Sequence, residues 1–168
     1  MVKNQDKTAM NVLEEAKCLE QQGQAFYRQA AEKTKNEKGK QLFLSLAKDE
    51  AMHESLIQRE ILHLLDEGYW VELLETQEAT CDLSVPIFPP GREGLKKAVK
   101  ADANDVDAVV TALEMETKSY DLYRREGEAA KDTAARQMYT FLAAQERNHF
   151  DLLMANYESM ERYGGWAD

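Results

Sequence analysis

The chain has 168 residues, enough for one ordinary domain, and 43% of them are apolar while 31% are charged. Its net charge of −10 would repel phosphates, which excludes nucleic-acid binding as the main role. No apolar run is long enough to span a membrane, and residues 1–17 lack the apolar core of a secretory signal, so we expect a cytoplasmic protein without membrane contact.

The first half of the chain predicts a helical hairpin over residues 8–65, made of one helix at about 8–33 and a second at about 37–65. A different kind of segment follows, from 66 to 104. Its Pro-rich stretch at 81–91 cannot be helical throughout. Two short helical pieces are expected inside this crossover, at residues 69–78 and 92–100.

The second half predicts another helical hairpin, over residues 105–163. Asn104 or Asp105 is a plausible N-cap for its first helix and Asp132 for its second, and Gly164 ends the second helix. Two hairpins joined by a long crossover are one known way to build a four-helix bundle. We therefore expect an all-α, antiparallel four-helix bundle that forms a single domain over residues 1–168.

The two hairpins repeat each other at an offset of 96 residues, with no insertion or deletion. Each carries a Glu, a Tyr seven residues later, and a Glu-x-x-His motif that begins thirty residues after the first Glu. The residues are Glu20, Tyr27, Glu50 and His53 in the first hairpin, and Glu116, Tyr123, Glu146 and His149 in the second. One Glu-x-x-His is weak evidence by itself, but the repeat specifies all of these positions jointly.

The six Glu and His residues stand where a bundle helix normally carries apolar side chains. In the second helix, for example, the three-four alternation reads Phe43, Leu46, Glu50, His53, Ile57. A buried carboxylate without compensation costs on the order of several kcal/mol. Two divalent cations would balance four carboxylates and take the two imidazoles as nitrogen ligands. We therefore predict a dinuclear metal centre with these ligands: Glu20, Glu50, His53, Glu116, Glu146 and His149.

Four other residues lie on or near the same inward seam. Tyr27 and Tyr123 are predicted to donate hydrogen bonds that orient ligand carboxylates, the alternative being core aromatics whose hydroxyls are satisfied elsewhere. Gly23 and Ser119 are small residues one turn from the ligands. They would either leave room for a small oxidant or allow close helix packing.

A third Glu-x-x-His motif, Glu60 to His63, has no counterpart in the second hairpin. It also points about 80° away from His53 around the same helix. We interpret His63 as a histidine at the surface or rim rather than as a ligand.

Four segments of the chain resemble rubrerythrin. They are Leu-Glu-Gln-Gln-Gly-Gln-Ala-Phe-Tyr (19–27), Asp-Glu-Ala-Met-His (49–53), Met-Glu-Thr-Lys-Ser-Tyr-Asp-Leu-Tyr (115–123) and Gln-Glu-Arg-Asn-His (145–149), and Ile-Phe-Pro (87–89) in the crossover is similar to short members of that family. The resemblance implies a ferritin-like fold whose six ligands bind two iron ions, with manganese or mixed occupancy as alternatives. It also implies a cytosolic homodimer that reduces hydrogen peroxide, while related members oxidise Fe(II) or bind dioxygen.

Two departures from the family pattern bear on function. Rubrerythrins proper carry a rubredoxin domain with four cysteines, whereas this chain has only Cys18 and Cys81, so we expect electrons from an external, rubredoxin-like donor protein. They also use an additional Glu where this chain has Ser119. The expected function is a diiron peroxidase with no catalytic residues beyond the metal ligands. The alternatives are a ferroxidase that oxidises Fe(II) and passes on or stores the iron, and a module whose metal is structural.

Overall fold

In the computed structural model, the described residues form four long helices and contain no strand. The helices are α1 (Asn4–Lys33), α2 (Glu37–Asp66), α4 (Ala103–Ala129) and α5 (Thr133–Tyr163). The structure describes residues 4–73, 79–86 and 102–167. None of the described helices is apolar enough over a sufficient length to cross a membrane. The predicted all-α class is confirmed.

Side-chain caps define where α2 and α5 begin. The Asn36 side chain accepts from the backbone amides of Lys38 and Gly39, and the Asp132 side chain accepts from that of Ala135. These bonds satisfy amides that have no partner inside the helix. The helix α5 ends at Gly164, whose φ of 75° is readily adopted by glycine, as the sequence predicted.

The start of α4 differs from the prediction that Asn104 or Asp105 would cap it. Asp102 is the N-cap, because its carboxylate accepts from the backbone amide of Asn104 and the helix therefore begins at Ala103. Asp105 lies in the first turn instead, where its carboxylate accepts from the indole of Trp166 at 3.0 Å. The prediction of the cap was wrong by two to three residues.

The described parts of the crossover are not helical, so the short helical piece expected at 69–78 is wrong over residues 69–73. The buried Glu60 carboxylate accepts a hydrogen bond from the backbone amide of Val71, which ties this non-helical stretch to α2. Residues 74–78, the piece expected at 92–100 and the Ile-Phe-Pro stretch lie outside the described residues.

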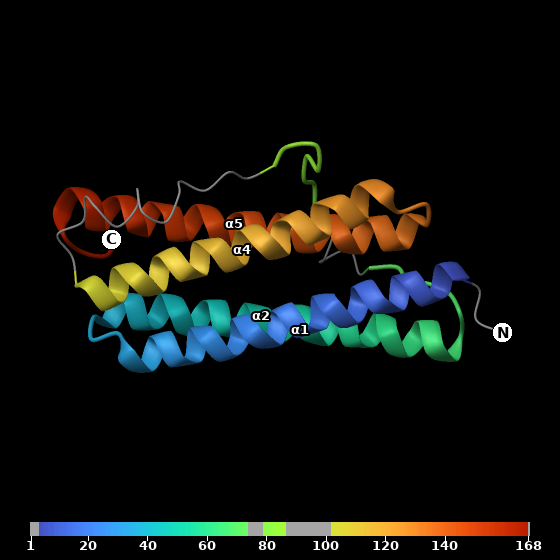
Figure 1. The fold of residues 1–168 in the computed structure, drawn as a ribbon, viewed down its shortest axis with the longest axis horizontal. Coiled ribbons are helices and arrows are strands. Elements are labelled where there is room, and N and C mark those ends of the chain that lie inside the picture. Colours follow the sequence, from blue (N-terminus) through green and yellow to red (C-terminus); the bar gives the residue numbers. More distant parts are fainter. Residues whose placement is uncertain (1–3, 74–78, 87–101, 168) are drawn as a thin grey trace.

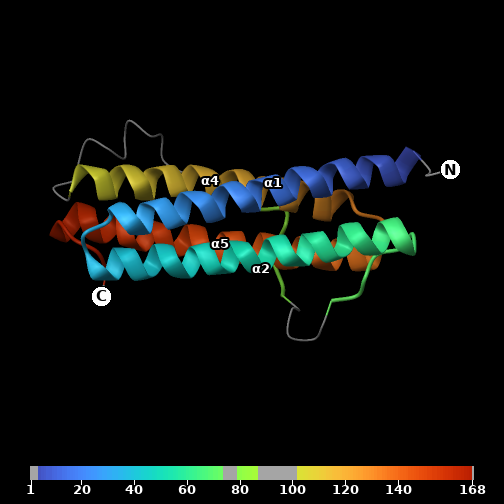
Figure 2. The ribbon, with the colours of Figure 1, turned by 90° about the horizontal axis from the view of Figure 1, so that it is seen from below.

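The four helices form two antiparallel hairpins that pack against each other along the length of the molecule (Figures 1 and 2). In both views α1 lies beside α4 and α2 lies beside α5, so neighbouring helices run in opposite directions. The C-terminus lies at the end where α1 turns into α2, and the N-terminus lies at the opposite end. The predicted bundle of two hairpins is confirmed.

The core is divided into two apolar clusters. One contains Tyr27, Phe43 and Leu113, and the other contains Leu13 and Ile57, each with further buried neighbours from all four helices. Along every helix, a buried Glu separates the residues of one cluster from those of the other. A polar layer therefore crosses the middle of an otherwise apolar core.

Candidate metal centre

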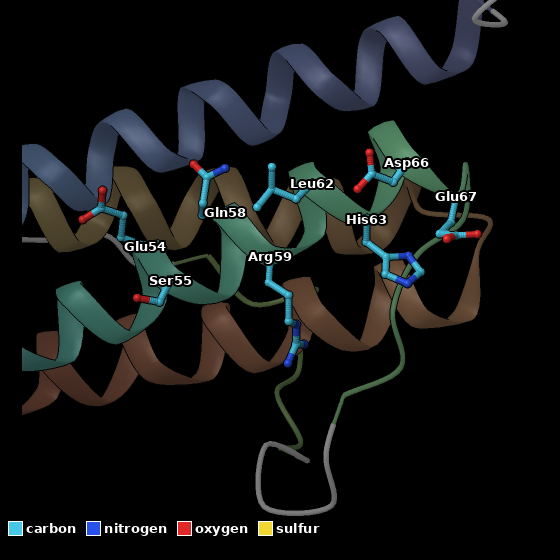
Figure 3. Close-up of a pocket in the computed structure, with 8 residues that line it drawn as sticks. All are labelled: Glu54, Ser55, Gln58, Arg59, Leu62, His63, Asp66 and Glu67. Carbon is cyan, nitrogen blue, oxygen red and sulfur yellow. The ribbon is translucent and has the colours of Figure 1, made fainter.

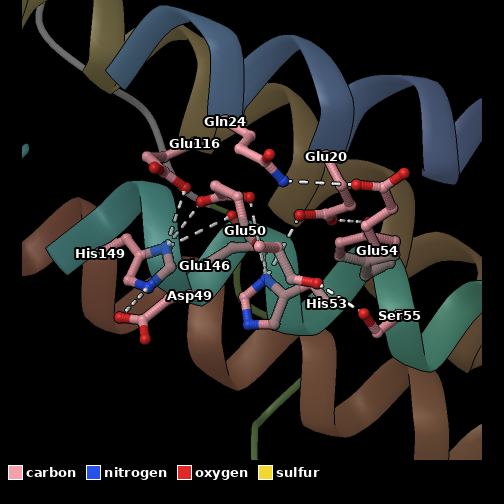
Figure 4. Close-up of polar contacts among 12 residues, drawn as sticks. Glu20, Gln24, Asp49, Glu50, His53, Glu54, Ser55, Glu116, Glu146 and His149 are labelled. Atoms are coloured by element: carbon pink, nitrogen blue, oxygen red, sulfur yellow. Dashed lines mark hydrogen bonds and ion pairs between the residues drawn. The ribbon is translucent and has the colours of Figure 1, made fainter. Parts of the chain in front are cut away.

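The six side chains predicted to bind metal point toward one another in this polar layer (Figure 4). Glu20 comes from α1 and Glu116 from α4, while α2 and α5 each contribute a Glu and a His one turn apart. Their exposed fractions are all small: Glu20 1%, Glu50 4%, His53 0%, Glu116 2%, Glu146 1% and His149 5%. Four acidic and two imidazole side chains are thus withdrawn from water together.

The six residues form two overlapping groups of four, in each of which the ligand atoms lie within 4.8 Å of one another. The first group is Glu20, Glu50, His53 and Glu146, and the second is Glu50, Glu116, Glu146 and His149. Glu50 and Glu146 belong to both groups. Each group therefore has one imidazole, one carboxylate of its own and two shared carboxylates, an arrangement that could hold two cations bridged by two carboxylates.

Both histidines turn the same ring nitrogen toward the carboxylates. The Nδ1 atom of His53 lies 3.1 Å from Glu146 Oε1 and 3.3 Å from Glu20 Oε2. The Nδ1 atom of His149 lies 3.3 Å from Glu50 Oε1 and 3.5 Å from Glu116 Oε2. The two rings are stacked with centroids 5.6 Å apart. Each imidazole is therefore placed next to one of the two four-residue groups.

Several of the converging atoms are buried without a hydrogen-bond partner in the described part of the chain. They are Glu20 Oε2, Glu50 Oε1, Glu146 Oε1, and the Nδ1 atoms of His53 and His149. Buried polar atoms are normally paired, and these five converge on one region without hydrogen-bond geometry between them. Oxygen and imidazole nitrogen are ligands that suit iron and manganese, so the residues present fit a pair of divalent cations.

The carboxyl groups differ in their protonation chemistry. Burial raises the pKa of Glu20 and Glu116 well above the usual range, and repulsion from Glu146 adds to this effect. Burial also tends to raise the pKa of Glu50 and Glu146. Their pKa values are nevertheless lowered, because neighbouring carboxyl groups and both imidazoles interact with the charged form. These interactions favour the charged form of the two shared residues.

The histidines hold protons more firmly than ordinary histidines. Burial alone would lower the pKa of His53, but its interactions with Glu146 and Glu20 raise it well above the usual value. The pKa of His149 is likewise raised, against the effect of burial, by Asp49 and the carboxylates around it. The surrounding carboxylates therefore favour the protonated form of both imidazoles.

Two tyrosines connect the hairpins at the centre. The Tyr27 hydroxyl of α1 donates to Glu116 of α4, and the Tyr123 hydroxyl of α4 donates to Glu20 of α1. Both side chains are at most 1% exposed, and burial raises the pKa of each hydroxyl well above its usual value. The hydroxyls therefore remain neutral donors, and each orients the carboxylate that belongs to one group only.

Gly23 is explained by its contact with Glu50. A Cβ atom at position 23 would lie 3.3 Å from Glu50 Cγ, closer than most side-chain contacts. Of the two interpretations of this small residue, close packing against a carboxylate of the centre is the one the structure supports. Ser119, its counterpart in the repeat, is partly exposed.

Asp49 is a residue of the site that the sequence interpretation missed. Its Oδ2 atom lies 3.5 Å from His149 Nε2, the nitrogen that faces away from the centre (Figure 4). The interaction with His149 lowers the pKa of Asp49. The available signal was the Asp directly before a Glu-x-x-His motif, but Asp49 lies outside the apolar seam and its side chain is 40% exposed.

His63 lies outside the centre, in a groove of about 640 Å³ on the outer side of α2 (Figure 3). Its Nδ1 atom is 3.1 Å from the Tyr69 carbonyl oxygen, and its ring packs edge-on against the Tyr69 ring. None of the six converging residues lines this groove. Glu60, the acidic partner in the motif, instead accepts hydrogen bonds from Val71 and Arg59.

A family model of known proteins matches most of the chain. The rubrerythrin family model matches residues 11–157, which include all four helices in large part and all six converging residues. Searches of curated proteins and of solved structures gave no match.

Proposed function

The chain belongs to the rubrerythrin family, and on that premise we propose a non-haem diiron oxidoreductase that reduces hydrogen peroxide with electrons from a separate donor protein. The observation that carries the proposal is the pair of four-residue groups that share Glu50 and Glu146. Two Fe(II) ions held there would supply the two electrons that, with two protons, convert one peroxide molecule into two water molecules.

The chain's own residues would bind the ions and keep their surroundings unchanged during turnover. Glu50 and Glu146 would bridge the two positions, and the four carboxylates together would balance the charge of two divalent ions. The Nδ1 atoms of His53 and His149 would each bind at one position. The apolar clusters on both sides limit the access of water, since the six side chains are at most 5% exposed.

The tyrosines would restrict the carboxylates that are not shared. Tyr27 holds Glu116 and Tyr123 holds Glu20, so each hydroxyl limits the rotation of a ligand from the opposite hairpin. Such outer hydrogen bonds commonly change metal affinity or activity by about 10- to 100-fold when they are removed.

The electron source is proposed to lie outside these 168 residues. Their two cysteines, Cys18 and Cys81, cannot form a four-thiolate iron site. A rubredoxin-like donor, a homodimer and a cytoplasmic location remain predictions.

The test compares two oxidants on the same diferrous protein. The apoprotein is loaded with Fe(II) without oxygen and mixed in a stopped flow with hydrogen peroxide or with dioxygen, while the near-ultraviolet absorption of the diferric centre is followed. We expect two irons per chain, oxidation at least about tenfold faster with peroxide, and repeated turnover when a reductant is added. Faster oxidation by dioxygen, with iron uptake well beyond two per chain, would instead identify a ferroxidase.

Two histidine variants provide a matched control. His53→Ala removes an imidazole of the centre, whereas His63→Ala removes one from the outer groove of the same helix. The first should lose iron at one position and the fast peroxide reaction, and the second should keep both. Wild-type protein that does not bind two irons would contradict the proposal directly.

A further inference from the structure

We propose that Asp49 makes the two metal positions unequal, so that a divalent cation binds more tightly next to His149 than next to His53. The inference deepens the proposed function, since it requires that two cations bind at the centre. It concerns the groups near the Nε2 atoms of His53 and His149, which face away from the carboxylates of the centre and where the two halves of the chain differ.

The imidazole of His149 has an acceptor on its outer side. Its Nδ1 atom faces Glu50 and its Nε2 atom lies 3.5 Å from Asp49 Oδ2. A metal bound at Nδ1 requires that the proton of the neutral ring sit on Nε2. Asp49 is placed to accept that proton in a hydrogen bond, which fixes the ring orientation and makes Nδ1 a better ligand.

Among the residues that the structure describes, the imidazole of His53 has no such acceptor. Its Nδ1 atom faces Glu146 and Glu20, but its Nε2 atom is buried and has no hydrogen-bond partner among the described residues. The ring lies edge-on to Phe141, with centroids 6.5 Å apart. A metal bound at this Nδ1 would leave the Nε2–H buried and unpaired, which weakens binding at this position.

The repeat shows where the difference arises. At the offset of 96 residues the position of Asp49 on α2 corresponds to Gln145 on α5. The two Glu-x-x-His motifs are thus preceded by a carboxylate in one hairpin and by a neutral amide in the other. A carboxylate is the stronger acceptor for a metal-bound imidazole.

The test measures metal binding without turnover. Apoprotein is titrated with Co(II) under nitrogen by calorimetry and visible absorption, and we expect two binding steps whose dissociation constants differ at least about tenfold. Asp49→Ala should weaken the tighter step about tenfold and leave the other within about twofold. The low end of the usual 10- to 100-fold range applies because the Asp49 side chain is 40% exposed and water competes for the hydrogen bond. Asp49→Asn, which keeps an acceptor oxygen, should recover part of the loss.

Three further variants assign the effect to His149. Gln145→Ala is the matched change in the other hairpin and should alter neither step. In a His149→Ala background the Asp49→Ala change should have no further effect, whereas in a His53→Ala background it should keep its full size. The Co(II)-shifted Nε2–H proton resonance of His149 should move in Asp49→Ala, while that of His53 stays in place.

The outcomes separate this inference from the proposed function. Two Co(II) ions that bind with equal affinity, or two steps that Asp49→Ala leaves unchanged or weakens equally, would overturn the inequality and leave the dinuclear centre intact. A wild-type chain that binds fewer than two Co(II) ions would overturn the centre itself.

Discussion

The N-terminal and C-terminal hairpins agree closely at the centre. Each contributes one Glu from its first helix, one Glu-x-x-His motif from its second, and one Tyr that reaches a carboxylate of the other hairpin. The correspondence holds at a constant offset of 96 residues. Two cations that are bound by the same types of side chain need two matching sets of ligands, which explains why a repeated hairpin is a suitable scaffold for such a centre.

The hairpins differ one turn away from these residues. On the first hairpin Gln21 and Gln24 donate to the partly exposed Glu54, at 2.7 and 3.3 Å. At the positions that correspond to Gln24 and Glu54, the second hairpin has the buried Tyr120 and Phe150. The Tyr120 hydroxyl donates to the Val85 carbonyl oxygen, so the crossover covers this side. The residues at these positions are therefore polar in the first hairpin and buried aromatic in the second.

The ends of the hairpins, in contrast, share one contact. Buried Glu60 and Asn156, which correspond in the repeat, each accept the backbone amide eleven residues later, from Val71 and Ala167. A Trp precedes each of these amides. The two hairpins therefore match at the centre and at this end contact, and differ in the residues that lie between them.

The largest effect is predicted for the loss of the two carboxylates that both four-residue groups share. Replacing both shared carboxylates, by Glu50→Ala with Glu146→Ala, removes two ligands from each four-residue group. We expect loss of both metals, with affinity reduced by more than about 100-fold, while the chain stays helical, because the apolar clusters on either side are untouched. Equilibrium dialysis with metal analysis, together with circular dichroism, measures both properties.

The control for this variant is Glu54→Ala, one turn further along α2. Glu54 bonds to Gln21 and Gln24 and belongs to neither group, so this protein should still bind two metals. If the double variant bound two metals with unchanged affinity, the assignment of the shared ligands would be wrong.

The second prediction concerns how the stability of the metal-free protein depends on pH, through the acidic and imidazole groups that both halves contribute to the centre. The pKa values of Glu20 and Glu116 are raised by burial, and those of His53 and His149 by the carboxylates around them. In the unfolded chain such groups titrate near 4.5 and 6.5. A group whose pKa is higher in the folded than in the unfolded chain contributes stability when the pH is below its pKa in the unfolded chain. This contribution is lost as the pH rises toward its pKa in the folded chain. The metal-free protein should therefore become less stable as the pH increases above about 4.5.

The slope can be at most about 1.4 kcal/mol per pH unit for each titrating group. Glu50 and Glu146 have lowered pKa values, so their own contribution is lost only when the pH falls below about 4.5. Metal binding should show the opposite trend, because cations displace the protons and the affinity rises with pH. Urea unfolding of the metal-free protein at about pH 5.5 and about pH 8, and Co(II) titration over the same range, test both signs. Stability that increases with pH in the metal-free protein would contradict the protonation scheme.

Much of this architecture could be predicted from the sequence. The helices follow from long amphipathic patterns, and the meeting of Glu50 with Glu146 follows from their places on inward seams of repeated hairpins. The start of α4 could not be predicted, because Asp102, Asn104 and Asp105 are all good N-caps and the sequence alone does not choose among them. The role of Asp49 could not be predicted either, because it depends on the distance to His149 in the other hairpin and not on the pattern of its own helix.

A last prediction concerns the stability of the fold at the two ends and leaves the centre untouched. Trp166 is 9% exposed, packs edge-on against Phe43 and donates its indole N–H to Asp105 at 3.0 Å. Its counterpart Trp70 is half-buried and packs against Tyr139, which corresponds to Phe43. Trp166→Ala should lower the free energy of unfolding by about 3–4 kcal/mol and Trp70→Ala by about 1–2 kcal/mol, as measured by urea unfolding in the same metal state.

The reason for the difference lies in the residues that receive each indole. A Cβ atom at Gly39 would come within 2.3 Å of the Trp166 ring, so this glycine allows the deep position. Around Trp70, the residue that corresponds to Gly39 is Ala135. The residue that corresponds to Asp105 is Ala9, whose side chain cannot accept a hydrogen bond from an indole. Gly39→Ala should therefore cost about 1–3 kcal/mol and reduce the effect of Trp166→Ala, because the ring would already be displaced. Equal losses for the two Trp variants, with Gly39→Ala neutral, would show that the two ends are packed alike.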